Sequence, residues 1–445
     1  MNKNEALFRD QPVWKAILTV SIPSVFSILI MLVYNMADMY FIGQLKDTAQ
    51  IGAISVVSPA FSIFNAVATM IGVGGSASIA KAFGADDRDY ARICASLCGW
   101  TCIIAGAAGA LFLIVFCDPM PSLLGATEDM WSYAGTYMRI LAGGAPFMLF
   151  SVGYASMLRA EGAILQGFKG NLIGTLLNMI LDPVFILWLK MGTAGAAVAT
   201  VIGNIAASLY FMHYILKKAQ ILTLNPSYAM QKPSALFHIL LLGLPNALSS
   251  ILSGFSSTFG NRLLRNYGSA ALAANGAAGK VMMLITLIQM GICMGAQPLM
   301  AYNYGAKNTS RLKEILQKLT ILTASFGIVT TVLCIFARRF LISIFLKDPE
   351  AAAMGEQIVA WLLAAGPLMG LFYISTNFLQ ASGKAILATV VSVLRQGILL
   401  IPLLYIMHAL LGFTGVAAAH AAADIGAALI AAGIMLQVYR KMPVQ

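Results

Sequence analysis

Three carboxylates lie within or at the ends of long apolar stretches of the sequence: Asp38, Asp182 and Asp424. Most of the other carboxylates fall in polar connections. A carboxylate in the middle of a bilayer costs about 2.5–3.5 kcal/mol on insertion scales, so such a residue is a functional candidate by default. These three positions are where chemistry is first expected.

Each of the first two carboxylates has a polar partner one helical turn before it. Tyr34 precedes Asp38, Asn178 precedes Asp182, and on the next apolar stretch Thr200 precedes Asn204. Residues four apart share one face of a helix, and a polar face must turn away from lipid. Carboxylate, amide and hydroxyl oxygens suit a proton or a hard cation. The pattern predicts an oxygen-rich pocket in which two neighbouring carboxylates titrate as a coupled pair, with any Na⁺ held by these side chains: Asp38, Asn178, Asp182 and Thr200.

The composition of the chain predicts the kind of secondary structure on which these residues lie. The chain has 445 residues, of which 59% are hydrophobic and 10% charged, against about 25% charged in an ordinary soluble domain. The apolar blocks do not alternate as barrel strands do, and each can cross a core of about 30 Å as a helix. The expected spans are 15–41, 51–78, 92–116, 131–158, 164–189, 194–216, 235–260, 270–303, 314–337, 352–380, 385–408 and 413–437. We therefore expect an all-α polytopic membrane protein.

The basic residues predict the orientation of the chain. With a cytoplasmic N-terminus, 18 of the 28 Lys and Arg side chains lie inside, seven (Lys46 among them) lie outside, and three lie within spans. By the positive-inside rule this bias predicts that both termini lie on the cytoplasmic side of the membrane. The expected location is a bacterial-type inner membrane. The same bias also accounts for the net charge of +11 without a nucleic-acid partner.

The second half of the chain repeats the first at a shift of about 221 residues. The matching pairs include Gly74 with Gly295, Pro146 with Pro367, Gly162 with Gly383, and Gly192 with Gly412. Since each half has six spans, we expect twelve transmembrane helices in two six-helix bundles related by a parallel internal repeat. The expected domains are lobes at 1–216 and 234–445, with a polar cytoplasmic linker at 217–233.

The repeat also provides an internal control for the polar set, which the second copy does not keep. In that copy, the matching positions are Gly260 for Asp38, Ile398 for Asn178, Pro402 for Asp182, His420 for Thr200, and Asp424 for Asn204. A set needed only for folding should recur, so we expect a functional role in the N-terminal half.

Structural alternatives remain open at several of these positions. Asp182 precedes Pro183 and could serve as a helix cap or kink, as could Asp38. His420 and Asp424, with Arg395, fit either a structural packing network or a function, and their role is left open.

Other patterns narrow the function. The glycines at 72–75 are not followed by Lys-Ser/Thr, and no Walker A, HExxH or GxSxG motif occurs, so neither ATP chemistry nor a membrane-embedded enzyme is favoured. Cys94, Cys98 and Cys102 share one helix face and are read as packing residues. Pro23 lies within the first span and predicts a kink, which is either static or a hinge.

These segments together resemble the multidrug and toxic compound extrusion (MATE) family. The first span through Tyr34 and Asp38, NMILDPVFI with GTAGAAVATVIGN, and GAQPLMAYNYGAKNTSRLK resemble its first, fifth, sixth and eighth spans. The resemblance implies an N-lobe cation site at Asp38, Tyr34, Tyr137, Asn178, Asp182 and Thr200. Acidic residues of another branch, on the seventh and tenth spans, are missing apart from Glu356, so the sequence looks like the DNA-damage-inducible F and Mep-type branch.

The combined interpretation is a secondary active antiporter that exports amphipathic, cationic organic compounds in exchange for H⁺ or Na⁺ by alternating access. We expect it to act as a monomer among membrane lipids and to need no cofactor besides the coupling ion. A flippase for a lipid-linked precursor of the same superfamily is the rival; it would need a cationic cleft for phosphates, whereas the charges expected in the cavity are mostly acidic. A membrane-embedded enzyme is the rival from another class.

Overall fold

The computed structural model describes residues 3–45, 47–123 and 126–441, which are almost entirely helical, with no strand among them. Lys46 and the two chain ends, which entered the prediction of orientation, lie outside the described residues. The first half contains α1 (Lys3–Arg9), α2 (Val13–Gly43), α3 (Thr48–Gly84), α4 (Arg88–Val115), α5 (Met120–Leu123), α6 (Glu128–Ala160), α7 (Ile164–Asp182), the π-helix η1 (Pro183–Trp188), α8 (Thr193–Lys217) and α9 (Pro226–Gln231).

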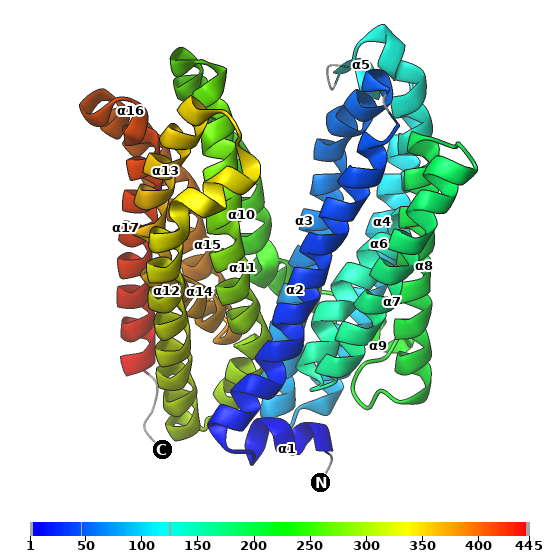
Figure 1. The fold of residues 1–445 in the computed structure, drawn as a ribbon. Helices are drawn as coiled ribbons and strands as arrows, with labels where there is room; N and C mark the ends of the chain where they lie inside the picture. Colours follow the sequence, from blue (N-terminus) through cyan, green and yellow to red (C-terminus); the bar gives the residue numbers. More distant parts are fainter. Residues whose placement is uncertain (1–2, 46, 124–125, 442–445) are drawn as a thin grey trace. The chain divides into compact units, whose positions relative to one another are not determined.

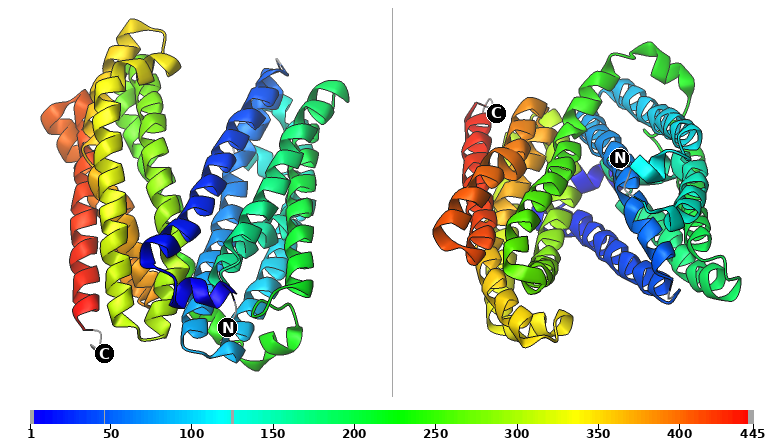
Figure 2. Two further views of the ribbon diagram at one scale, coloured as in Figure 1. Left: turned by 60° about the horizontal axis from the view of Figure 1, so that its bottom comes forward. Right: turned by 90° about the horizontal axis from the view of Figure 1, so that it is seen from above.

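The second half begins with α10 and ends with α17 (Figure 1). It contains α10 (Ala235–Leu264), the 3₁₀ turn η2 (Arg265–Tyr267), α11 (Gly268–Gly305), α12 (Thr309–Phe345), α13 (Pro349–Leu363), α14 (Gly366–Ala381), α15 (Ala385–Val393), the π-helix η3 (Leu394–Leu399), α16 (Leu400–Leu411) and α17 (Phe413–Arg440). Figure 2 shows these long helices from two further directions.

Ten helical segments of the described residues are long and apolar enough to cross a membrane, and the bent pair α13 and α14 makes an eleventh. One of the ten, Ala235–Gly305, contains both α10 and α11. Each of the twelve predicted spans thus has its own helix or bent helix pair. The all-α, multi-pass membrane fold is confirmed.

One predicted span differs from the expected single helix. The sequence predicts a continuous helix over 352–380, but the structure divides it into α13 and α14, bent by 47°. Pro367 follows the bend in the first turn of α14. A proline has no N–H to continue the helix, and its ring clashes with the preceding turn. The second helix therefore starts anew at Gly366.

Backbone geometry at equivalent positions confirms the internal repeat. Glycines that the repeat pairs share unusual positive φ values: Gly162 (80°) with Gly383 (82°), and Gly192 (58°) with Gly412 (60°). The turns before α4 and α12 also match, since Asp87 accepts a hydrogen bond from the Tyr90 N–H and Asn308 accepts one from the Arg311 N–H, each at 3.0 Å. Both are N-caps that satisfy otherwise free N–H groups at a helix start.

The chain forms two compact units by internal contacts. Unit 1 comprises Phe26–Gly243 with the first residues up to Ala6, and unit 2 comprises Leu7–Val25 with the chain from Leu244 onwards. The division therefore crosses α2 and α10, within two residues of Pro23 and Pro245 respectively. These two prolines are repeat equivalents, each inside a continuous helix. The predicted lobes at 1–216 and 234–445 stay a prediction.

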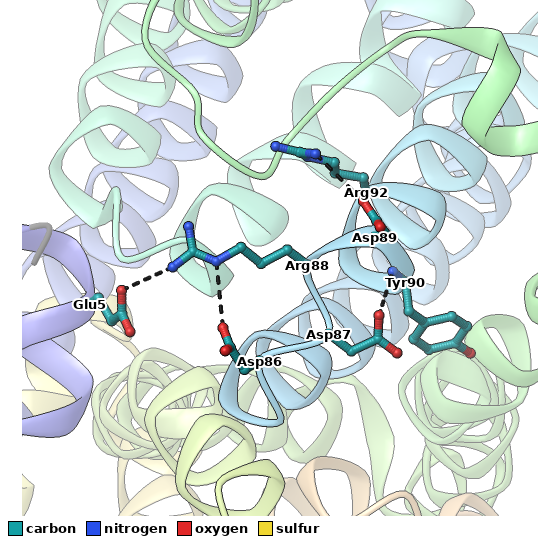
Figure 3. A network of polar contacts seen from close by, with 7 residues as sticks. All are labelled: Glu5, Asp86, Asp87, Arg88, Asp89, Tyr90 and Arg92. Atoms are coloured by element: carbon teal, nitrogen blue, oxygen red, sulfur yellow. Dashed lines mark hydrogen bonds and ion pairs between the residues drawn. The ribbon is translucent and has the colours of Figure 1, made fainter.

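A polar network joins the start of the chain to the turn between α3 and α4, within unit 1 (Figure 3). Arg88 contacts Glu5 at 3.4 Å and Asp86 at 3.6 Å, and Arg92 contacts Asp89 at 3.6 Å. Most of these side chains are well exposed, so each pair contributes at most about 1 kcal/mol. The network orients a polar turn and is separate from the buried polar residues.

The three stacked cysteines of α4 are buried free thiols. The Cys98 Sγ atom would lie 2.6 Å from a Cβ placed on Gly75, and the Cys102 Sγ atom 2.8 Å from one on Gly153. They fill the space that these glycines leave. The structure thus agrees with a packing role.

Candidate functional site

The six residues of the predicted cation site come from four helices of unit 1. Tyr34 and Asp38 lie on α2, Asn178 and Asp182 on α7, and the remaining two on α6 and α8, namely Tyr137 and Thr200. Helices α6 and α8 pack along their length, as do α7 and α8. The site is therefore built from side chains projecting inward from a helical bundle.

A close crossing of α7 and α8 determines which of their polar side chains lie opposite one another. A Cβ on Gly174 would lie 2.7 Å from the Gly203 carbonyl oxygen, and one on Gly203 would lie 2.6 Å from the Gly174 carbonyl oxygen. Only glycine allows the two backbones to approach so closely. Asn178 lies one turn beyond Gly174, and Thr200 lies one turn before Gly203, so the crossing brings these two side chains together.

Hydrogen bonds join three of the helices through one hydroxyl group. The Asn178 amide donates to the Thr200 Oγ1 atom at 3.3 Å, and the Tyr34 and Thr200 hydroxyls are in hydrogen-bond contact. Thr200 therefore links α2, α7 and α8. This arrangement fixes the orientation of the Asn178 side chain, whose oxygen is left free.

The two carboxyl groups are close enough to interact electrostatically with one another. Both also interact with the hydroxyl groups of Tyr34 and Tyr137. Tyr137 is 9% exposed and packs edge-on against Phe61, with ring centroids 6.4 Å apart. The structure thus brings all six predicted residues into one neighbourhood, while their role in coupling stays a prediction.

Several oxygens in this neighbourhood are buried without a hydrogen-bond partner among the described residues. They are Asp38 Oδ1, Asn178 Oδ1 and both carboxyl oxygens of Asp182. All four are acceptors, and each buried acceptor without a donor costs about 1–3 kcal/mol. A proton or a hard cation bound at these oxygens would satisfy them. The oxygen atoms therefore fit either H⁺ or Na⁺.

Asp182 does not cap or brace a helix. Its residue is fully buried, and its side chain makes no capping bond to the π-helix η1 that follows. Pro183 opens η1, where the missing N–H and the bulk of the ring disturb the helical bonding pattern. The change from α-helix to π-helix begins at Pro183 itself, and the carboxyl group of Asp182 has no hydrogen-bond partner among the described residues.

Asn204, one turn after Thr200, has a different role. It accepts a hydrogen bond from the Ser151 hydroxyl at 2.9 Å and donates to the Thr200 carbonyl oxygen at 2.9 Å. Its amide is thus satisfied on both sides and fastens α8 to α6. The sequence pattern alone did not separate this structural amide from the free oxygens beside it.

The matching region of unit 2 contains an ion pair. Arg395 Nε lies 2.7 Å from Asp424 Oδ1, and its guanidinium stacks over the Phe372 ring at 4.9 Å. The carboxylate of Asp424 is therefore neutralised by a neighbour, unlike those of Asp38 and Asp182. Among the residues that the structure describes, unpaired buried carboxyl oxygens occur only in the N-terminal half.

Comparisons with known proteins agree with this architecture. The MatE family model matches residues 23–184 and again residues 245–406, one match for each repeat. The chain belongs to the MatE family. It is 33% identical to the multidrug export protein MepA of Staphylococcus aureus (strain N315) over 417 residues, which are 93% of this chain and 92% of that protein.

Two solved structures share the MatE fold of this chain. Crystal structures of a MATE protein in the straight and in the bent conformation each align with a TM-score of 0.93 at 22% identity. Each alignment covers 99% of this chain, with 99% of the straight chain and 98% of the bent one. The MatE fold is therefore shared along the whole length.

Proposed function

We propose that this MatE protein is a secondary active antiporter that exports amphipathic, cationic organic compounds in exchange for H⁺ or Na⁺. The observation that carries the proposal is Asp182, a fully buried carboxyl group with neither oxygen bonded within the described residues, next to Asp38. MepA, its relative, is described as a multidrug export protein. Drug transport by a multi-pass protein of the bacterial cell membrane is consistent with the buried carboxyl groups and with this relative.

The site performs exchange through competition for negative charge. A coupling cation that binds the free oxygens of Asp38, Asn178 and Asp182 removes the charge that a cationic drug needs. The drug leaves when the ion binds, and the ion leaves when the drug binds. For ion binding to shift the protein from one conformer to the other, the two conformers must bind the ion with different affinity.

Helix α2 is the element that we assign to the conformational step. Pro23 lies inside α2, close to the point where the helix passes from unit 2 to unit 1, and Asp38 lies about four turns further on. Bending at Pro23 would move the segment that carries Tyr34 and Asp38. The straight and bent crystal forms of a MATE protein support a bending transition as part of the cycle.

The test is drug efflux by the purified protein in liposomes, with a pH gradient and a Na⁺ gradient imposed separately. We expect efflux of a fluorescent organic cation to follow at least one of the two gradients. Efflux that ignores both gradients, with the protein correctly inserted, would overturn the antiport mechanism. Movement of a labelled anionic lipid driven by neither gradient would favour a flippase instead.

A further inference from the structure

A cavity of about 870 Å³ lies within unit 2. Side chains of α10, η2, α11, α13, η3 and α17 line it. Drug-sized ligand sites commonly measure about 300–1,000 Å³. The cavity is therefore large enough for an organic molecule, and the cation-exchange site of unit 1 does not account for it.

This cavity occupies the place in the second repeat that the polar pocket occupies in the first. Its lining includes Gly260, His420 and Asp424, the repeat equivalents of Asp38, Thr200 and Asn204. A Cβ on Gly260 would lie 4.0 Å from the His420 Nε2 atom, so these equivalents adjoin one another, as their N-terminal counterparts do. The two halves have thus placed different chemistry at one position of a duplicated scaffold.

The charges around the cavity are mainly positive. Three arginines line it together with a single carboxylate: Arg262, Arg265, Arg395 and Asp424. Arg395 is paired with that carboxylate, whereas neither Arg262 nor Arg265 forms an ion pair with any described residue. These charges differ from the acidic set of the N-terminal half. The two free guanidinium groups can each offer several donors to an anion.

The two free arginines lie where α10 ends and η2 begins. Arg262 and Arg265 flank the end of α10 and the start of η2, where Tyr267 packs against Phe413 at the start of α17, with ring centroids 5.9 Å apart. Gly260, two residues before Arg262, adjoins His420, and His420 precedes Asp424 by one helical turn. The Arg395–Asp424 pair therefore lies on the same wall of the cavity as the region that carries the free arginines.

Apolar and uncharged polar side chains also line the cavity. Leu272, Met282 and Met283 line the cavity along α11 beside the amide of Asn275. A Cβ on Gly276 or Gly279 would meet no atom within 4 Å, so both glycines border open space. Methionine side chains adapt to varied apolar shapes. The cavity thus combines a cationic region with an adaptable apolar wall.

We propose that this cavity is a second ligand site, which binds amphipathic organic anions. The carboxylate, sulfonate or phosphate of the ligand contacts Arg262 and Arg265, and its apolar body lies along Leu272, Met282 and Met283. The ligand is either a free organic anion or the headgroup region of an anionic lipid. Both offer the same anionic group to the same guanidinium pair.

The test is equilibrium binding of naphthalene-2-sulfonate to the purified full-length protein in nanodiscs of neutral phosphatidylcholine. The neutral analogue naphthalene-2-methanol controls for apolar partition. We expect saturable binding of the sulfonate, at least tenfold tighter than that of the alcohol. The Arg262→Gln/Arg265→Gln variant should weaken sulfonate binding at least tenfold while leaving that of the alcohol unchanged.

Further variants distinguish the effect of the arginine charges from the effect of the cavity volume. Arg338→Gln/Arg339→Gln removes the same two charges from the end region of α12, outside the cavity lining, and should bind the sulfonate as the wild type does. Gly276→Leu/Gly279→Leu fills the cavity without changing its charge and should weaken binding at least tenfold. Gly433→Leu, which also meets no atom within 4 Å at its Cβ, is the matched control and should not.

The proposal is overturned if the wild type binds the sulfonate no more tightly than the alcohol, or if the arginine variant in the cavity behaves like its control. Phosphatidylglycerol added to the nanodiscs separates the two sources of the anion. If it displaces the sulfonate from the wild type, the occupant is a lipid headgroup; if it does not, the occupant is a free organic anion. This binding assay is independent of gradient-driven transport, so its outcome stands apart from that of the antiport test.

Discussion

Replacing Asp182 by Asn should make the protein more stable while removing its coupling function. In the wild type both carboxyl oxygens of Asp182 are buried without a donor among the described residues, and each such acceptor costs about 1–3 kcal/mol. The amide keeps one oxygen and introduces N–H donors among acceptors that lack partners, such as Asp38 Oδ1 and Asn178 Oδ1. Relief of a single free acceptor predicts a gain of about 1–3 kcal/mol.

The matched control is Asn204→Leu on the adjacent helix. It removes two formed hydrogen bonds, to Ser151 and to the Thr200 carbonyl oxygen, and should lower stability by about 1–3 kcal/mol at about 0.5–1.5 kcal/mol for each bond. The two substitutions are similar in size and lie near one another. They should nevertheless shift stability in opposite directions.

The assay is thermal unfolding of the purified proteins, followed by tryptophan fluorescence in detergent free of Na⁺ at neutral pH. The melting temperature should rise for Asp182→Asn and fall for Asn204→Leu. Adding the coupling cation should then raise the melting temperature of the wild type but not that of Asp182→Asn, because a ligand stabilises only the form that binds it. If Asp182→Asn lowers the melting temperature as much as Asn204→Leu does, the carboxyl group of Asp182 has a structural role and its oxygens do not destabilise the wild type.

Three further predictions concern orientation, bending and pH. Cysteines introduced at 217–233 should be labelled only from the cytoplasmic side, and labelling by an impermeant reagent in intact cells would contradict the topology. Pro23→Ala should slow turnover more than it weakens equilibrium drug binding. Transport by this variant at the wild-type rate, with an unchanged ion dependence, would show that Pro23 has a structural role only. Burial raises the pKa of Glu161, which accepts hydrogen bonds from the backbone N–H groups of Gln220 and Leu222, above its ordinary value of 4.5. Since the folded state then holds this proton more tightly than the unfolded chain, the melting temperature of the wild type relative to Glu161→Gln should fall as the pH rises through 4.5 and above; a constant difference would show that Glu161 does not titrate on unfolding.

The fold was largely predictable because a lipid-exposed backbone must satisfy its own hydrogen bonds, which restricts apolar blocks of this length to helices. The repeat was predictable from glycines such as Gly162 and Gly383, whose backbone φ values few other residues adopt. The bend between α13 and α14 was missed, although Gly366 and Pro367 could have signalled it. Pro146 occupies the matching position inside an unbroken α6, so proline alone does not decide the outcome.

The N-terminal site was predictable in its residues but not in its bonding. Spacing placed Asn178 and Asn204 in the same class, yet only the structure shows that Asn204 is satisfied while Asn178 retains a free oxygen. The cationic cavity of unit 2 left no local signal. Arg395 lies more than a hundred residues after Arg262 and Arg265 in the sequence, and the count of basic residues treated the latter two only as charges outside the membrane. Their meeting depends on helix packing, which spacing does not reveal.

We propose that coupling depends on the unpaired carboxyl groups of the N-terminal half. The most direct test of this proposal compares gradient-driven drug efflux by Asp38→Asn and by Asp424→Asn in matched proteoliposomes. Efflux should be abolished in Asp38→Asn, because a neutral amide cannot exchange a proton or Na⁺ for a cationic drug. It should remain measurable in Asp424→Asn, whose carboxylate is already neutralised by Arg395 in the wild type. Efflux at the wild-type rate by Asp38→Asn would show that Asp38 is not a coupling carboxylate.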